Sequence, residues 1–327
     1  MPAVIPYDPA AMERVDACVG CGGKLLRPVY RNNDLTHLDK PMDPRWRNSD
    51  FVLCQRCGLL FAQWRQTKPF ADHYYSYFAE YEHRFYNQFP LPQAYVQGKH
   101  VAAGEVIALM QEQGVVDPRH RVLQLRCDCG AFLARLRDEF GYQQLFGLDY
   151  FDTNIRYARE ILKLENIGQL SAAELNTPFG QQKYDLIISN HQITHAFRPA
   201  EWLIATRALL APGGTVVFYN EQDHARVFRS RGLNRGINNF HKQLLTERSF
   251  SNLAAIAGLD ARLIGLRKNT MVFIARACEP VAAAAITDSG SAPLERAVQS
   301  WIANQHSPTY QFMRRVGRAA KRLLRVA

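Results

Sequence analysis

The chain has 327 residues, 47% of them hydrophobic, and a formal net charge of +10. A chain of this length can bury a full α/β core and still carry a smaller module. No run approaches the ~18 apolar residues of a membrane-spanning helix, and the N-terminus lacks the basic start and apolar stretch of a secretory signal, so we expect a cytoplasmic protein. In a reducing compartment the seven cysteines, four of them in C-x-x-C spacing, favour a metal site over disulfides.

Residues 1–70 are predicted to form a small zinc-binding head of the zinc-ribbon type. Two C-x-x-C pairs, each followed by glycine and separated by thirty-two residues, supply the predicted ligands Cys18, Cys21, Cys54 and Cys57. Four thiolates complete a tetrahedral zinc site, and a glycine after each pair provides left-handed backbone for a tight turn. The alternative, a thioredoxin-like redox pair, requires a strand-to-helix context that is absent here. We expect the zinc to be structural, because about fifty residues hardly build a core of their own.

Residues 94–278 alternate between helix and strand patterns. Alternation at this spacing indicates a doubly wound α/β domain, in which a parallel sheet is wrapped by helices. The last two strands are adjacent and fit a hairpin. The predicted helices are 94–113, 131–138, 153–164, 200–210 and 250–258, and the predicted strands are 122–125, 144–149, 168–173, 184–190, 214–221, 261–267 and 270–276.

The first strand, turn, helix and second strand of this domain have the form of a nucleotide-cofactor half-site. The turn ends at Gly130, and the helix that follows points its N-terminal amides back over the turn, where an anion is favoured. Asp149 ends the second strand nineteen residues later. This is about where such units place the carboxylate that binds two ribose hydroxyls.

This unit resembles the first motif of class I S-adenosylmethionine-dependent methyltransferases, which reads roughly acid-x-Gly-x-Gly-x-Gly. The segments YDLIISNHQITHAFRP and LLAPGGTVVFYNE extend the resemblance over roughly residues 15–278. It implies a seven-stranded Rossmann-like sheet with a terminal antiparallel hairpin, and S-adenosylmethionine as cofactor. The residues that it places at the cofactor are Gln124, Arg126, Gly130, Asp149 and Asn190.

The chain departs from the motif at its acid and at its first two glycines, which are Gln124, Arg126 and Asp128. The first glycine position is expected to need positive φ, which costs a non-glycine residue about 1–2 kcal/mol. Two roles for Arg126 stay open. Its guanidinium pairs with the cofactor carboxylate, or it fills the pocket and leaves a pseudoenzyme.

The resemblance also implies acid/base residues at the carboxyl ends of the fourth and fifth strands. His195 falls on the histidine of the first of the two segments, where it can remove a proton from the acceptor. Glu221 and His224 follow the fifth strand at the same edge, and His241 lies in a later segment that can reach the substrate. The alternative is that these side chains pack or satisfy backbone groups.

The head and a tyrosine-rich connector, residues 71–93, resemble the zinc-binding part of methyltransferases that act on nucleotide-linked sugars, including the sugar C-methyltransferases. The resemblance rests on CGLLFAQW after the second cysteine pair and on a Y-x-Y-F segment. In that family the segment lines the active site, which makes Tyr75 and Tyr77 candidates for substrate contact. The alternative is that these aromatic residues attach the head to the main domain.

Residues 279–293 are small and alanine-rich and are predicted to be a linker, followed by a basic helical tail at 294–327. The tail is expected to hold helices at 294–304 and 309–326. Six positive charges and no acid lie between residues 314 and 325, opposite an apolar stripe. Such a helix suits an anionic membrane surface, and docking on protein is the alternative. Nucleic acid is not expected, because aromatic residues are not interleaved with the cations.

The sequence therefore favours methyl transfer from S-adenosylmethionine to a nucleotide- or lipid-linked sugar or a similar small acceptor. Asp149 would bind the ribose, and His195 with Glu221, His224 or Tyr77 would form the acid/base set. The alternative is a catalytically silent domain that binds a nucleotide or sugar and scaffolds a biosynthetic complex through its tail.

Overall fold

The fold is given by a computed structural model. It describes residues 6–32, 43, 45, 49–70, 88–170, 175, 179, 182–231 and 241–305. Three predictions lie outside these residues, namely the roles of Tyr75 and Tyr77 and the helix at 309–326. Of the described helices, none is long and apolar enough to cross a membrane.

The main domain is built on a seven-stranded sheet with the order β12-β13-β10-β9-β6-β7-β8. Neighbouring strands are parallel from β10 to β8, and β13 is antiparallel to both of its neighbours. The strand order runs outward from β6 in both directions, so the doubly wound sheet with a terminal hairpin is confirmed. The strands are β6 (Val122–Leu125), β7 (Leu145–Asp149), β8 (Asn166–Gln169), β9 (Tyr184–Asn190), β10 (Leu210–Gln222), β12 (Leu259–Arg267) and β13 (Thr270–Ala277).

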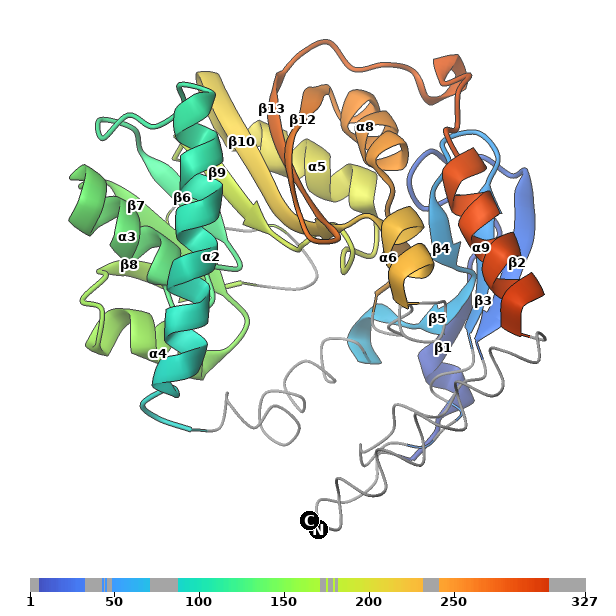
Figure 1. Cartoon of the computed structure of the whole chain (residues 1–327), viewed down its shortest axis with the longest axis horizontal. Helices are drawn as coiled ribbons and strands as arrows, with labels where there is room; N and C mark the ends of the chain where they lie inside the picture. Colours follow the sequence, from blue (N-terminus) through green and yellow to red (C-terminus); the bar gives the residue numbers. More distant parts are fainter. Residues whose placement is uncertain are drawn as a thin grey trace.

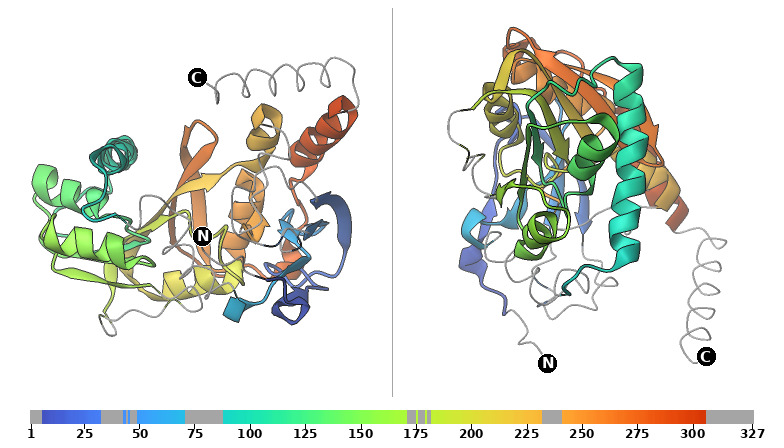
Figure 2. Two further views of the ribbon diagram at one scale, coloured as in Figure 1. Left: turned by 90° about the horizontal axis from the view of Figure 1, so that it is seen from below. Right: turned by 90° about the vertical axis from the view of Figure 1, so that its left-hand side faces the viewer.

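Helices cover both faces of this sheet (Figures 1 and 2). Alternate side chains of the central strands enter two different cores, as strand geometry requires. Helices α2, α3 and α4 contribute to one core, and α5 and α8 contribute to the other. These helices are α2 (Gln93–Glu112), α3 (Ala131–Phe140), α4 (Asp152–Glu160), α5 (Pro199–Ala208) and α8 (Glu247–Ile256).

Element boundaries differ from the prediction by a few residues. Helix α4 ends at Glu160 instead of 164, and Lys163 then has a left-handed φ of 56°. Strand β8 begins two residues earlier than predicted and is paired only as far as Gln169. Helix α5 ends at Ala208 because Leu210 already pairs with β9 as the first residue of β10.

The head is not an independent module. It contains β1 (Met12–Arg14), which pairs with β5 (Trp64–Gln66), and a sheet of β2 (Leu26–Asn32), β3 (Ser49–Cys54) and β4 (Leu60–Ala62). The main domain adds a fourth strand, β11 (Gln243–Leu244), to the edge of that sheet. In addition, the cysteines share one hydrophobic core with Phe250 and Leu253 of α8. The head and the sheet domain are therefore joined by both hydrogen bonds and apolar packing.

The predicted linker after residue 278 is a packed segment. Its short 3-10 helix, η4 (Ala283–Ala285), lies against the shared core. Further on, the carbonyl of Asp288 accepts a hydrogen bond of 2.9 Å from the side chain of Asn252, and the carbonyl of Ser289 lies 1.9 Å from where a Cβ on Gly58 would stand. Glycine is required at position 58 because the segment around Ser289 passes this close to the turn after Cys57.

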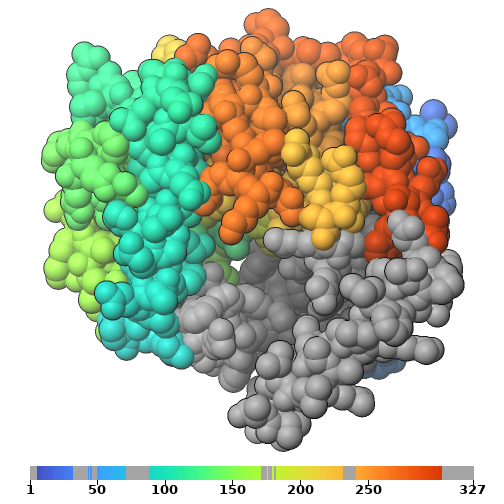
Figure 3. Space-filling model, in the orientation of Figure 1, coloured from blue at the N-terminus to red at the C-terminus, as the bar shows by residue number. Residues whose placement is uncertain are grey.

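The first tail helix, α9 (Ala292–Gln305), docks on protein. Its Leu294, Ala297 and Val298 are buried against the head and against α6 (His224–Arg231). The face in Figure 3 shows α2, the β12–β13 hairpin, α6 and α9 side by side. The two predicted roles, membrane binding and docking on protein, concern the basic helix at 309–326, which lies outside the described residues.

Candidate functional site

The carboxyl ends of β6, β9 and β10 meet at one edge of the sheet, and the backbone there is strained. Positive φ occurs at Arg126 (58°) and Asp128 (52°) after β6, at His191 (52°) after β9 and at Asn220 (62°) in β10. Non-glycine residues adopt this conformation at a cost, and such residues concentrate at functional sites. The prediction of positive φ at the first glycine position is confirmed. The loop has left-handed backbone at both positions where a motif glycine has been replaced.

The one glycine kept in this motif is required by packing. Gly130 has a φ of 82° and immediately precedes α3. A Cβ at this position would lie 2.8 Å from side-chain carbons of both Ala158 and Leu164. Close contact between the loop and α4 therefore leaves no room for a side chain.

The side chain of Asp149, at the end of β7, hydrogen-bonds to the loop that follows β6. The residue is fully buried. Its carboxylate accepts hydrogen bonds from the backbone amides of Asp128 (2.8 Å) and Phe151 (3.1 Å) and from the side chain of Asn154 (2.9 Å). Burial, with the nearby charge of Asp128, raises the pKa of Asp149 to about 7. These contacts hold the loop after β6 against the end of β7, and the role of Asp149 as a ribose ligand stays a prediction.

A second buried carboxylate, Asp128, lies next to a small cavity of about 20 Å³ lined by Lys99, Gln124 and Tyr219 among others. The Asp128 carboxylate lies 2.7 Å from the Lys99 ammonium and accepts a 2.8 Å hydrogen bond from Asn190. Burial alone would raise the pKa of Asp128, but the charges of Lys99 and Arg126 hold it below its usual range. Gln124 donates to the Tyr219 hydroxyl (3.0 Å), and its own side-chain oxygen is buried with no partner.

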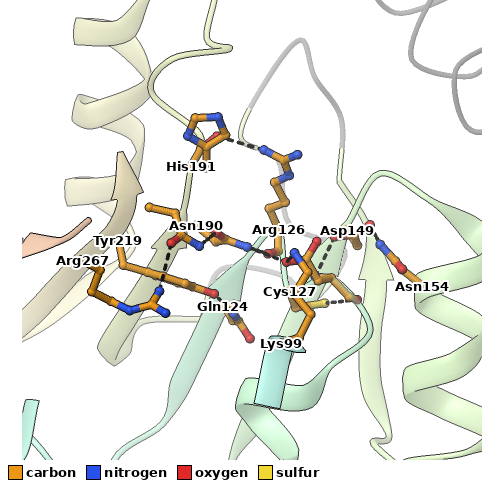
Figure 4. A network of polar contacts seen from close by, with 12 residues as sticks. Lys99, Gln124, Arg126, Cys127, Asp149, Asn154, Asn190, His191, Tyr219 and Arg267 are labelled. Atoms are coloured by element: carbon orange, nitrogen blue, oxygen red, sulfur yellow. Dashed lines mark hydrogen bonds and ion pairs between the residues drawn. The ribbon is translucent and has the colours of Figure 1, made fainter. Parts of the chain in front are cut away.

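Arg126 connects the loop after β6 to the residue after β9 (Figure 4). Its guanidinium donates a 3.1 Å hydrogen bond to the carbonyl of His191, while the side chain of Asn190 donates to the carbonyl of Arg126 itself (3.1 Å). The side chain is partly exposed. Arg126 therefore lies between the predicted cofactor loop and the histidines.

Three histidines face one another beyond Arg126. The ring centroids of His191, His195 and His241 are 4.9–5.0 Å apart in every pairing, and the Nε2 atoms of His191 and His241 are 3.3 Å apart. Burial, with the charges of neighbouring cations, lowers the pKa of all three rings, to about 3 for His191. The three side chains are therefore neutral near pH 7. The sequence marked His195 and His241 separately, but it gave no signal that they meet.

The other two predicted acid/base residues are buried beside this cluster. Glu221 is fully buried and accepts hydrogen bonds from the backbone amide of Ile193 (3.0 Å) and the hydroxyl of Thr194 (2.9 Å). Burial raises its pKa. His224 is also fully buried, with Nδ1 3.2 Å from the carbonyl of Leu245. Both lie beneath the cluster, and their predicted acid/base roles stay predictions.

The four head cysteines converge as predicted. Their sulfurs lie within 4.8 Å of one another, with Cys18 3.6 Å from Cys57 and Cys21 3.5 Å from Cys54. Two sulfurs on a tetrahedral zinc ion are about 3.8 Å apart for zinc–sulfur bonds of about 2.3 Å. The glycines after the two pairs have φ of 69° and 74°, which confirms the predicted left-handed turns. The geometry fits a structural zinc ion.

Residues missed by the sequence analysis complete the edge of the sheet. Lys99 lies on α2, twenty-nine positions before the carboxylate that it pairs with. Tyr219 and Asn220 lie in β10, and the side chain of Asn220 donates to that of Asn190 (2.9 Å). No short-range motif marks these residues, because each partner comes from a different strand or helix.

The comparisons with known proteins agree with the fold. Residues 123–216 match the family model described as a methyltransferase domain. No curated protein sequence matches the chain significantly. The matched segment runs from β6 into β10, and the strand order around it is that of a doubly wound methyltransferase-like sheet.

Several solved structures resemble the chain distantly. The DhpI–SAH complex is 20% identical with a TM-score of 0.43, over 64% of this chain and 95% of that one. The CcbJ methyltransferase from Streptomyces caelestis is 16% identical with a TM-score of 0.42, over 55% and 89%. An O-methyltransferase family protein from Burkholderia thailandensis is 18% identical with a TM-score of 0.44, over 57% and 59%.

Proposed function

We propose that this protein transfers a methyl group from S-adenosylmethionine to a small-molecule acceptor. The observation that carries the proposal is the loop from Arg126 to Gly130. It keeps the left-handed backbone of a methyltransferase cofactor loop at a cost in strain, although two of its residues are not glycine. A domain that had lost its ligand would gain stability by relaxing this loop.

The charged and polar groups at the loop fit the methionine end of the cofactor. The Arg126 guanidinium is positioned to bind a carboxylate, and α3 begins five residues later at Ala131, where its N-terminus favours an anion. The unpartnered oxygen of Gln124 and the Asp128 carboxylate are acceptors for an ammonium group. When bound, S-adenosylmethionine supplies an electrophilic methyl group on a sulfonium ion.

We propose that the methyl acceptor binds at the cluster of His191, His195 and His241. Among the described residues, His195 is the partly exposed member of the predicted acid/base set, and His191 and His241 surround it. Methylation of a hydroxyl, amine or carbon acid releases one proton from the acceptor, and an uncharged imidazole at this edge can activate the attacking atom. Glu221 keeps the turn at Ile193 and Thr194 in place. Tyr77 stays a proposed contributor to this set.

The acceptor that we propose is a nucleotide- or lipid-linked sugar. The resemblance of the head to that of nucleotide-sugar methyltransferases supports this class. The positive charges of Arg126 and Lys242 near the cluster also favour an anionic acceptor.

In the head itself we propose one zinc ion on the four cysteines, which would hold the shared core together.

A mixture of nucleotide-linked sugars, compared with the same sugars unlinked, tests the acceptor class. With S-adenosylmethionine present, we expect S-adenosylhomocysteine to form with the linked sugars and not with the free ones. Methylation of free sugars at the same rate would reject the acceptor class but keep the reaction. Failure to bind S-adenosylmethionine at all would reject the reaction.

The burial of Asp149 favours a second candidate, a silent domain that binds a nucleotide or sugar and scaffolds a complex. In that case Arg126 fills the methionine site. The substitution Arg126→Ala would then create or tighten cofactor binding instead of weakening it.

Association of the tail beyond residue 305 with anionic membranes is a separate proposal. Loss of sedimentation with anionic vesicles after deletion of residues 307–327, with salt-sensitive binding of the full chain, would support it.

A further inference from the structure

A metal-binding geometry is present at the histidine cluster itself. His191, His195 and His241 each bring one ring nitrogen to within 4.8 Å of the other two. Two nitrogens on a tetrahedral zinc ion lie about 3.3–3.4 Å apart for bonds of about 2.0–2.1 Å. The Nε2 atoms of His191 and His241 are 3.3 Å apart. We propose that these three histidines bind a divalent transition-metal ion of the zinc type.

The hydrogen bonds of the two closest rings are incomplete without a further partner. If the Nε2 atoms of His191 and His241 bond to each other, one is the donor and the other the acceptor. The Nδ1 atoms of both rings are then left buried with no hydrogen-bond partner. Unsatisfied buried polar atoms are costly and often mark a site for an ion. With a metal on both Nε2 atoms, each Nδ1 carries a hydrogen that can be donated.

The Glu221 carboxylate lies near the Nδ1 atom of His191, beyond direct hydrogen-bond distance. Its Oε2 atom lies 3.9 Å from Nδ1 of His191, and the same carboxylate accepts from Ile193 and Thr194 in the turn that carries His195. Histidines that bind metals commonly donate their second nitrogen to a carboxylate, which fixes the ring and strengthens the ligand. The buried Glu221 thus acquires a function that direct acid/base chemistry does not give it.

The segments that carry the three rings are fixed in advance. Strand β11 brings His241 to the turn, because the backbone amide of Lys242 donates to the carbonyl of Thr194 (2.9 Å). The side chain of Gln243 donates to the carbonyls of Ile193 and Ala196 in the same turn. A preorganised set of ligands loses little freedom on binding a metal.

The ligand set indicates the class of metal. Three imidazoles without a thiolate suit zinc and neighbouring divalent ions, and three protein ligands leave a fourth position for water or a substrate oxygen. Arg126 and Lys242 add positive charge nearby, so an anionic fourth ligand is favoured. The metal site does not depend on methyl transfer. Only the assignment of its open position to the acceptor rests on the proposed function, in which His195 would then act as a ligand.

Metal content of the full chain tests the site without any use of cofactor or acceptor. The protein is saturated with Zn²⁺, freed of loose metal by gel filtration and analysed for zinc. We expect two ions per chain in the wild type, one in His241→Ala, and two in the control His100→Ala, which changes a histidine of α2 outside the cluster. If the cysteines hold no zinc, we expect one ion in the wild type, none in His241→Ala and one in His100→Ala.

Two further variants keep the test decisive. His195→Asn changes the partly exposed ligand and should lose the same ion if His241→Ala fails to fold. Glu221→Gln should weaken binding by about 10–100-fold in a chelator competition, the usual range for a carboxylate behind a metal-binding histidine. Equal zinc content in the wild type and in both histidine variants would overturn the proposal, whatever the outcome for methyl transfer.

Discussion

The cysteine cluster and the histidine cluster differ in where they lie and in what surrounds them. All four cysteines are buried, in a core that joins the head to α8. The histidines lie at the edge of the sheet, with His191 and His195 partly exposed beside strained backbone. A ligand in the first cluster would stabilise the fold, whereas one in the second would be reachable by an acceptor.

Removing one cysteine should have the largest effect on the molecule. We expect Cys54→Ser to unfold the head and to destabilise the shared core, because binding of a structural metal and folding are coupled. Cys278→Ser is the matched control, since this cysteine lies outside the cluster and is only partly buried. Thermal unfolding followed by calorimetry measures both. A cooperative, wild-type-like transition for Cys54→Ser would show that the cysteine cluster does not stabilise the fold, which would contradict the contrast with the histidine cluster.

Removing a histidine of the cluster should reduce activity rather than stability. We expect His195→Ala to keep its fold but to reduce turnover by about 10²–10⁴-fold, the usual range for one acid/base group. His100→Ala should leave turnover unchanged. Steady-state release of S-adenosylhomocysteine and a thermal melt of each variant give the two readouts. Near-normal turnover in His195→Ala would assign this residue to packing.

Asp149 should make stability depend on pH at the same edge of the sheet. Its pKa in the folded protein, about 7, lies above the 3.8 of an ordinary Asp carboxyl. The unfolded chain therefore releases this proton first, and the native state loses stability as pH rises from about 4 to about 7. The loss should amount to roughly 2–4 kcal/mol.

Urea unfolding at several pH values checks this prediction. Asp149→Asn should flatten the decline over that window, whereas Asp260→Asn, an exposed control in β12, should not. Parallel pH curves for the wild type and Asp149→Asn would show that the carboxyl is not buried as described.

Periodicity and motifs predicted the architecture because the elements that carry them are local. The alternation between residues 94 and 278 gave the parallel sheet, and the C-x-x-C spacing gave the cysteine cluster. The positive φ of Arg126 followed from its place in a glycine motif. In each case the physical constraint acts within one strand, one turn or one pair of turns.

The remaining features depend on residues that are distant in sequence. His241 lies forty-six positions after His195, and it reaches the cluster only because β11 joins the edge of the head sheet. The alanine-rich segment after residue 278 was predicted to be a linker, and its composition did not show that it would contact Gly58 and Asn252. The position of Asp149 at the end of β7 was predicted, but its hydrogen bonds to Asp128 and Asn154 were not, because these partners lie on other segments.

Calorimetric titration with S-adenosylmethionine tests the central claim, that the altered loop still binds the methyl donor. The wild type should bind, and Arg126→Ala should bind more weakly by about 1.5–3 kcal/mol, the scale of a hydrogen bond to a charged group. Arg121→Ala, at the other end of β6, should bind like the wild type. Absence of binding by the wild type, or tighter binding by Arg126→Ala, would contradict the account and favour a silent scaffold.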